Sequence, residues 1–218
     1  MKNKGQTPQF RKVETGNNIR MLVSTGLLIS LALLLPNCFS YVVDTRPSGR
    51  TFGEKAPLNV GHYITTKFEG YNVHKLGVLT IFYYPNLGEA SATQFKLELE
   101  QHFRKVETIW EIYPYTKNKA KELDVVIEPQ IDKFYVYNPP SNWQVWRASI
   151  TYKITVYDSN WNVLFTRFVE GIGDTKGRFW GPVSKNASAA SSKAIEDGVQ
   201  KAVDTILTSE EIKQLLKR

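Results

Sequence analysis

The stretch Trp146–Tyr157, WRASITYKITVY, decides the fold of this chain. Apolar side chains alternate with polar or charged ones along its whole length. Such alternation is typical of a β-strand with one face in the core and the other in water. The run Asp158-Ser159-Asn160 then predicts a turn, so we expect Trp161–Glu170 to return as the hairpin partner of this strand.

Three further strands are predicted on the N-terminal side of the hairpin. Leu76–Tyr84, LGVLTIFYY, is a nearly continuous apolar run, which indicates a buried strand. Thr108–Tyr115 and Leu123–Tyr137 are rich in aromatic and β-branched residues, which favour strands. Within Leu123–Tyr137 the apolar positions change parity near Asp132, so we expect a β-bulge there.

Two long helices complete the pattern. Ser91–Val106 carries apolar residues at helical spacing, and Ser91 is a candidate N-cap. Ala187–Leu207 carries a stripe of mostly small residues, so this helix is expected to lie close to a sheet. The segment Gly171–Gly181 is predicted to be a glycine-rich loop that leads into it.

A short last helix, Glu210–Lys217, is expected after a capping box formed by Thr208 and Glu211. The order of these elements predicts an α+β fold. Its sheet is expected to be mostly antiparallel with about five strands, and its two main helices are expected to pack on one face of that sheet.

The composition fits one globular domain. The chain has 218 residues, of which 42% are hydrophobic, so it is not a disordered chain. Its formal net charge is +7, but residues 1–37 hold five basic residues and one acidic residue, which leaves about +3 on the remainder. A charge that small does not predict nucleic-acid binding.

The N-terminal segment has the features of a secretory signal. A basic stretch precedes Met21–Leu35, which contains no charged residue, and the only cysteine, Cys38, follows. A basic region before a short apolar run describes a signal peptide, whereas a transmembrane helix usually needs about 20 apolar residues. Two alternatives stay open: an uncleaved membrane anchor, if the apolar run continues through Phe39–Val43, and a plain secretory signal.

Leu35-Pro36-Asn37-Cys38 resembles a bacterial lipobox, although Asn37 stands where the family usually has a small residue. The resemblance implies that residues 1–37 are removed and that Cys38 becomes the first mature residue, acylated with palmitate or a similar chain. Acyl chains hold a protein at a membrane because burying each methylene contributes about 0.8 kcal/mol. Phe39 rather than Asp follows the cysteine, which by analogy favours an outer-membrane location facing the periplasm.

The mature chain is predicted to have two parts. Residues 38–75 are rich in glycine, proline and polar residues, so we expect a tether with a short strand in His62–Glu69. Residues 76–218 are expected to form the globular domain.

No motif for catalysis or for a cofactor is found in the sequence. His62, His74 and His102 are too far apart in the predicted elements to suggest a metal site. The glycines of Gly171–Gly177 do not fit either phosphate-loop spacing. We therefore expect no enzyme activity, no cofactor and no metal.

An aromatic cluster is the candidate site. It lies around the turn between two long predicted strands. One further aromatic residue, Trp180, lies in the loop before the long C-terminal helix. Tyrosine and tryptophan often anchor protein interfaces, so a partner-binding patch is one interpretation; the other is that these rings cap the core of the sheet. The residues are Phe134, Tyr135, Tyr137, Pro139, Pro140, Trp143 and Trp180.

Three segments of the chain resemble a broad family of periplasmic accessory lipoproteins, which includes auxiliary lipoproteins of ABC transport systems and lipoproteins that activate cell-wall synthases. They are the strand that opens at Leu123–Glu128, the hairpin over Tyr157–Phe165 with Gly171 after it, and the alanine-rich helix from Ala187. The resemblance implies a non-catalytic domain that binds another envelope protein. The alternatives are a lipoprotein that binds a small ligand or glycan in a pocket of sheet aromatics, and an envelope hydrolase without a recognisable motif.

Overall fold

The computed structural model describes residues 37–40, 43, 45, 53–76, 80–84, 86–112, 115–138, 145–176 and 183–217. The predicted leader therefore lies outside the described residues, apart from Asn37. The strands are β1 (Asn37–Ser40), β2 (Ala56–Ile64), β3 (Val73–Leu76), β4 (Thr80–Tyr84), β5 (Phe103–Trp110), β6 (Val125–Tyr137), β7 (Val145–Asp158) and β8 (Val163–Lys176). The helices are α2 (Thr66–Glu69), α3 (Leu87–His102), α4 (Tyr115–Ala120), α5 (Val183–Thr208) and α6 (Glu210–Leu216).

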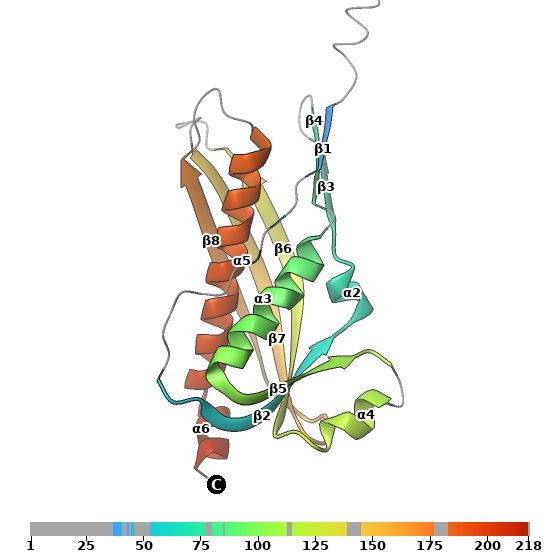
Figure 1. The fold of residues 1–218 in the computed structure, drawn as a ribbon, viewed down its shortest axis with the longest axis vertical. Coiled ribbons are helices and arrows are strands. Elements are labelled where there is room, and N and C mark those ends of the chain that lie inside the picture. The colour runs from blue at the N-terminus through green and yellow to red at the C-terminus, as the bar shows by residue number, and fades with distance from the viewer. Residues whose placement is uncertain are drawn as a thin grey trace, which may run out of the picture.

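The main sheet has five strands in the order β5-β2-β6-β7-β8 (Figure 1). The pairs β6–β7 and β7–β8 are antiparallel, whereas β2 is parallel to both β5 and β6, so the sheet is mixed. The predicted α+β class and the five-stranded size are confirmed. The predicted bulge is also confirmed, because the β6–β7 register shifts between Ile131 and Lys133.

The segment around Gly171 and Gly173 is strand, and the predicted loop at Gly171–Gly181 is wrong for residues 171–176. A Cβ atom on Gly171 would lie 2.1 Å from the Ala194 carbonyl oxygen, and one on Gly173 would lie 2.1 Å from the Ala190 carbonyl oxygen. The two glycines therefore let the backbone of α5 pass directly over β8. They indicate close packing of two backbones rather than a flexible turn.

The predicted tether is wrong for residues 56–75, because β2 is the second strand of the main sheet and α2 and β3 follow it. In β2, Val60 is fully buried, and so is His62. A Cβ atom on Gly61 would approach Ile109 Cδ1 to 2.6 Å and Leu123 Cδ1 to 2.7 Å, so a side chain at this position would collide with these two residues. Pro57, Gly61 and His62 interrupt the apolar pattern, so the sequence does not reveal this strand, whose centre at Val60–His62 is buried on both faces.

Helix α3 starts four residues earlier than predicted, with Asn86 at its N-cap position. Ser91 is therefore not a cap. It lies inside the helix, fully buried, and its hydroxyl donates to the Leu87 carbonyl at 2.8 Å. The helix passes directly into β5 at Phe103, so the strand predicted at 108–115 occupies residues 103–110 instead.

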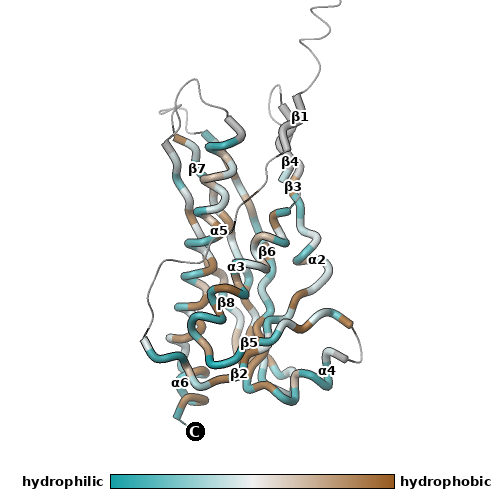
Figure 2. The backbone as a smooth tube through the Cα atoms, in the orientation of Figure 1, coloured by the Kyte–Doolittle hydropathy of each residue, from teal (hydrophilic) through white to brown (hydrophobic). Residues whose placement is uncertain are grey.

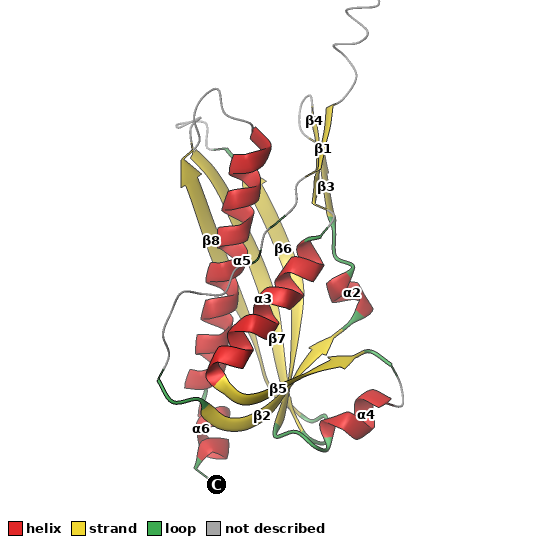
Figure 3. Cartoon of the chain, in the orientation of Figure 1, coloured by secondary structure: helices red, strands yellow, loops and turns green. Residues whose placement is uncertain are grey.

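Helices α3 and α5 pack on the same face of the main sheet, as predicted (Figure 3). The two helices also contact each other. The large core lies between these helices and the strands, and the alternating colours along α5 in Figure 2 follow its one-sided burial. The second core lies beside α4 and contains Ile109, Ala120, Leu123 and Val126. Among the described residues, none of the helices combines the length and the hydrophobicity needed to span a membrane.

A separate sheet of three strands has the order β1-β4-β3. The expected buried strand at Leu76–Tyr84 contributes β4 to this small sheet and not to the main one. Strand β1 is parallel to β4, with Cys38 opposite Ile81. A little further on, the Asn86 side chain bonds to both main-chain polar groups of Val43, at 3.2 Å and 3.1 Å.

The last helix has Ser209 as its N-cap, whose hydroxyl accepts from the Ile212 N–H at 3.4 Å. The predicted capping box at Thr208 was one residue early, because Thr208 still belongs to α5 and its hydroxyl donates to the Asp204 carbonyl.

Candidate partner-binding surface

One part of the main sheet faces away from α3 and α5, and we call it the open face. It consists of Lys133, Tyr135 and Tyr137 on β6, Arg147, Ser149, Thr151 and Lys153 on β7, and Phe168, Glu170, Ile172 and Asp174 on β8. Strand pairing sets the rows across it: Tyr135 lies opposite Ser149, which lies opposite Ile172. Four large apolar or aromatic side chains on this face are exposed: Tyr135 (51%), Tyr137 (45%), Phe168 (62%) and Ile172 (48%).

The next row contains a bidentate ion pair between Arg147 and Asp174. Arg147 Nε lies 2.8 Å from one Asp174 oxygen and its Nη2 lies 3.0 Å from the other. The hydrogen bond from Arg147 lowers the pKa of Asp174, while the bond to Asp174 and then the bond to Tyr137 raise the pKa of Arg147. The pair is about half exposed, so its main effect is to fix the position of the guanidinium beside Tyr137 rather than to add much stability.

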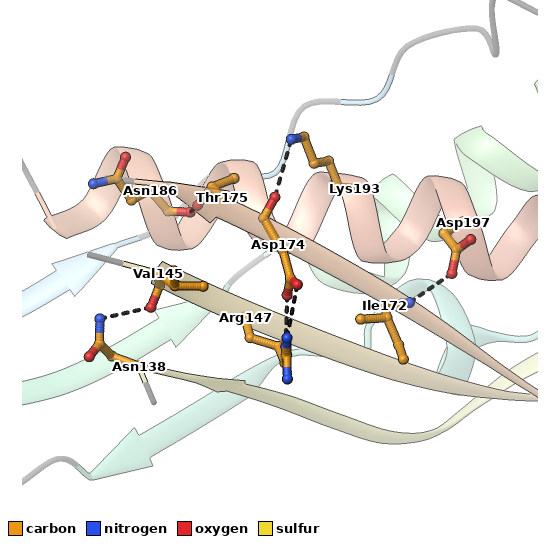
Figure 4. Close-up of polar contacts among 9 residues, drawn as sticks. All are labelled: Asn138, Val145, Arg147, Ile172, Asp174, Thr175, Asn186, Lys193 and Asp197. Carbon is orange, nitrogen blue, oxygen red and sulfur yellow. Dashed lines mark hydrogen bonds and ion pairs between the residues drawn. The ribbon is translucent and has the colours of Figure 1, made fainter. Parts of the chain in front are cut away.

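The outer edge of β8 is occupied by side chains of α5 (Figure 4). The Ile172 N–H donates to Asp197 Oδ2 at 2.8 Å, and the Lys193 ammonium donates to the Asp174 carbonyl at 3.2 Å. Lys201 bonds to the same Asp197 oxygen at 2.6 Å and to the Glu170 carbonyl at 3.3 Å. A strand edge whose polar groups are already paired is a poor template for another strand.

The other end of the sheet surface holds a buried polar group, Glu128. It accepts the Tyr157 hydroxyl at 2.5 Å and the Gln130 amide at 2.6 Å. Burial and then the bond to Glu128 raise the pKa of Tyr157. Glu128 therefore has hydrogen-bond partners for both oxygens, and the arrangement is that of a structural network beside the second core.

The structure separates the predicted aromatic cluster. Tyr135 and Tyr137 lie on the open face, whereas Phe134 is 4% exposed and its ring contacts the Tyr84 ring at 5.2 Å between centroids. The core-capping interpretation thus holds for Phe134. The remaining members of the predicted patch, Pro139, Pro140, Trp143 and Trp180, lie outside the described residues.

A group of buried polar side chains under α3 was not predicted from the sequence. His62 is fully buried against Phe95, at 6.1 Å between ring centroids, and within the described part of the chain neither of its nitrogens has a hydrogen-bond partner. Burial, and then the nearby Lys96, lower the pKa of His62 to about 3. Glu98, 1% exposed, lies 3.4 Å from His102 on the same helix. The burial of His62 could be predicted only if the segment that contains it were identified as a strand of the main sheet, β2.

The described residues contain no group of three or more histidine, cysteine, aspartate or glutamate side chains that is placed to hold a metal ion. His62 and His102 lie on different elements, and the side chain of His74 is outside what the structure describes.

No family model matches the chain, and no curated protein matches it. Among solved structures, a Xanthomonas campestris protein of family DUF330 is similar with a TM-score of 0.52 and 11% identity, over 83% of this chain and 99% of that one. The Chlamydia trachomatis protein CT253 is similar with a TM-score of 0.43 and 11% identity, over 68% and 95%. A minor lipoprotein of Acinetobacter baumannii is similar with a TM-score of 0.40 and 10% identity, over 68% and 91%. At these identities, the similarity to the Xanthomonas campestris protein shows a shared fold alone. The other two structures add nothing to that conclusion about the fold.

Proposed function

We propose that this chain is a lipoprotein of the bacterial envelope that acts as a non-catalytic accessory or scaffold subunit of a larger periplasmic complex. In this proposal Cys38 carries the lipid, the protein is held at the outer membrane facing the periplasm, and the open face binds an envelope protein. The observation that carries the binding part is the exposure of Tyr135 and Tyr137 side by side on the sheet face that points away from α3 and α5.

The leader supports the membrane part of the proposal. A basic segment, an uncharged run at Met21–Leu35 and a single cysteine directly after it are the sequence features of a lipidated export signal. An unpaired cysteine in an exported chain needs an explanation, and acylation gives one.

The open face supports the binding part. Tyrosine combines a large apolar ring with a polar end, and it is enriched where protein interfaces exclude water. Phe168 and Ile172 extend the apolar area across to β8, while Arg147 and Asp174 add a fixed polar row at its end. An apolar centre with a polar margin is the usual arrangement of a binding interface.

The lipid is tested by the mass of the mature N-terminus taken from membranes of the source cells, beside a Cys38→Ala variant. We expect a chain that starts at an acylated Cys38, and loss of that species in the variant. A chain that keeps residues 1–37 would instead be anchored by its leader, and a cleaved chain without lipid would remove the membrane part of the proposal.

Partner binding is tested by placing a photo-crosslinking amino acid at Tyr137 in the full chain, with the same amino acid at Ile112 as the control. Ile112 is 61% exposed and lies outside the open face, in the connection after β5. We expect one envelope protein to cross-link at 137 and not at 112, and Tyr135→Ala with Tyr137→Ala to prevent its capture without lowering the melting temperature by more than a few degrees.

Equal cross-linking at both positions would contradict the binding part of the proposal, as would a large fall in the melting temperature of the double variant. The competing function, binding of a small ligand or glycan, predicts a ligand-dependent rise in melting temperature that the double variant loses, with no protein cross-linked at 137.

A further inference from the structure

The two edges of the main sheet differ in how their backbone groups are used. On β8, side chains of α5 bond to main-chain groups of Glu170, Ile172 and Asp174. On β5, among the residues that the structure describes, the one main-chain group bonded by a side chain is the Trp110 carbonyl, which accepts the Thr116 hydroxyl at 2.8 Å. Within the described part of the chain, β5 is the outermost strand of the main sheet, and no described strand pairs with its outer edge from Phe103 to Ile109.

The side chains of β5 suit such pairing. Val106 and Thr108 are β-branched and half-buried, so they already form part of a pleated surface that a neighbouring strand would extend. Lys105 forms an ion pair with Glu107 on the same face of the strand, and Glu107 also lies 2.7 Å from Lys119. These bonds lower the pKa of Glu107, with the bond from Lys105 the largest cause, so the strand presents a positive and a negative charge two residues apart.

Symmetry limits how two copies of β5 can pair. A two-fold axis perpendicular to a sheet keeps each side chain on its own face, and residues directly opposite each other share a face. The axis must therefore pass between two copies of the same residue. An axis at Lys105 would oppose two lysines and one at Glu107 would oppose two glutamates, which destabilises the pair, whereas an axis at Val106 opposes Lys105 to the partner subunit's Glu107 twice.

We propose that this protein forms a two-fold dimer in which β5 pairs antiparallel with β5 of a second copy, centred on Val106. The two five-stranded sheets then join into one, and the charges of Lys105 and Glu107 are matched across the interface. The occupant of this edge is a second copy because the charge order Lys105-Val106-Glu107 is self-complementary in that arrangement.

The register is tested by cysteine cross-linking of the full chain in cells, with the wild-type chain, which has Cys38 alone, as background. Directly opposed residues of antiparallel strands have Cα atoms about 4.5–5.5 Å apart, which is within the range of a disulfide. We expect Val106→Cys to form a disulfide-linked dimer. Thr108→Cys, which faces the partner subunit's Arg104, should not link to itself but should link to a co-expressed Arg104→Cys chain.

The charge match is tested by sedimentation of the purified full chain in detergent. Lys105→Glu should lower the association constant of the dimer about tenfold, since it replaces two attractive cross-strand pairs by repulsive ones. The swapped variant, Lys105→Glu with Glu107→Lys, should recover most of that loss, and the melting temperature of each variant shows that it is folded.

Three results would overturn the proposal: a Val106→Cys chain that stays monomeric, a Lys105→Glu chain that dimerises as well as wild type, or a cross-link from position 106 to a different protein in place of a second copy. None of these results bears on the open face, because the two surfaces share no residue.

Discussion

The hydroxyl of Tyr152 on β7 lies 2.8 Å from the hydroxyl of Ser91 on α3, and both residues are fully buried. Because Ser91 donates its own proton to the Leu87 carbonyl, Tyr152 is the donor in this pair. The Tyr152 ring also meets the Phe95 ring edge-on at 5.0 Å and lies against Gly198 of α5. One tyrosine thus joins the sheet to both long helices, and burial raises its pKa.

This pair predicts an asymmetry between two small substitutions. Tyr152→Phe removes one hydrogen bond but leaves Ser91 bonded to Leu87, so it should lower the free energy of unfolding by about 1 kcal/mol. Ser91→Ala leaves the buried Tyr152 hydroxyl without an acceptor, which should cost about 1–3 kcal/mol. Urea unfolding measures both, and an equal or smaller loss in Ser91→Ala would contradict the assignment of the donor.

His62 predicts how stability depends on pH. Its folded pKa of about 3 lies below the ordinary value of 6.5, so below pH 6.5 the unfolded chain binds a proton that the folded chain does not. Stability contributed by neutral His62 is therefore present above pH 6.5 and is lost as the pH falls toward 3. Between pH 7 and pH 5 the loss should be about 2 kcal/mol.

The matched control for His62 is His62→Leu, which keeps an apolar side chain at the site and removes the titration. All other titrating groups are shared, so the difference between the two unfolding curves isolates His62. The variant should lose less stability than wild type between pH 7 and pH 5. Parallel curves would mean that His62 is accessible to protons in the folded state.

Gly171 predicts that one added methyl group is strongly destabilising at the contact between β8 and α5. In Gly171→Ala the new Cβ would meet backbone atoms of Ala194 and Gly198 at 2.1–2.5 Å, and backbone cannot rotate away. We expect a loss of at least about 2 kcal/mol in the free energy of unfolding.

Gly53→Ala is the control, since a Cβ there meets nothing within 4 Å. Its effect should stay within about 0.5 kcal/mol. Similar effects of the two substitutions would show that α5 and β8 lie further apart than described.

The antiparallel half of the fold could be predicted because its strands have one wet face. In β7 the buried residues Ile150, Tyr152 and Ile154 alternate with half-buried polar ones, and this is the strongest signal that a single sequence can contain. The parallel half has no such signal. The centre of β2, from Val60 to His62, is buried on both sides, and the strand contains Pro57 and Gly61, which a sequence pattern cannot distinguish from a linker.

The candidate site was predictable to a similar extent. Tyr135 and Tyr137 could be identified because they alternate with the buried Phe134 and the half-buried Val136 along one strand. The two edge strands of the main sheet could not be identified from the sequence. The position of a strand at the edge depends on the order of the strands in the sheet, and no local sequence pattern encodes that order. For the same reason, the roles of Asp197 and Lys201 at the β8 edge follow from the position of α5 and from nothing in their sequence context.

The position of strand β1 limits how the domain could be oriented at a membrane. If Cys38 is the first mature residue, the chain enters a sheet at once, since Cys38 lies opposite Ile81, and Val43 is bonded to Asn86 soon after. A lipid at Cys38 would then be joined to the folded body with almost no free chain between them. The bilayer would hold the domain at a restricted tilt with the small sheet nearest the lipid, so that the direction in which the open face points would be set by the fold itself.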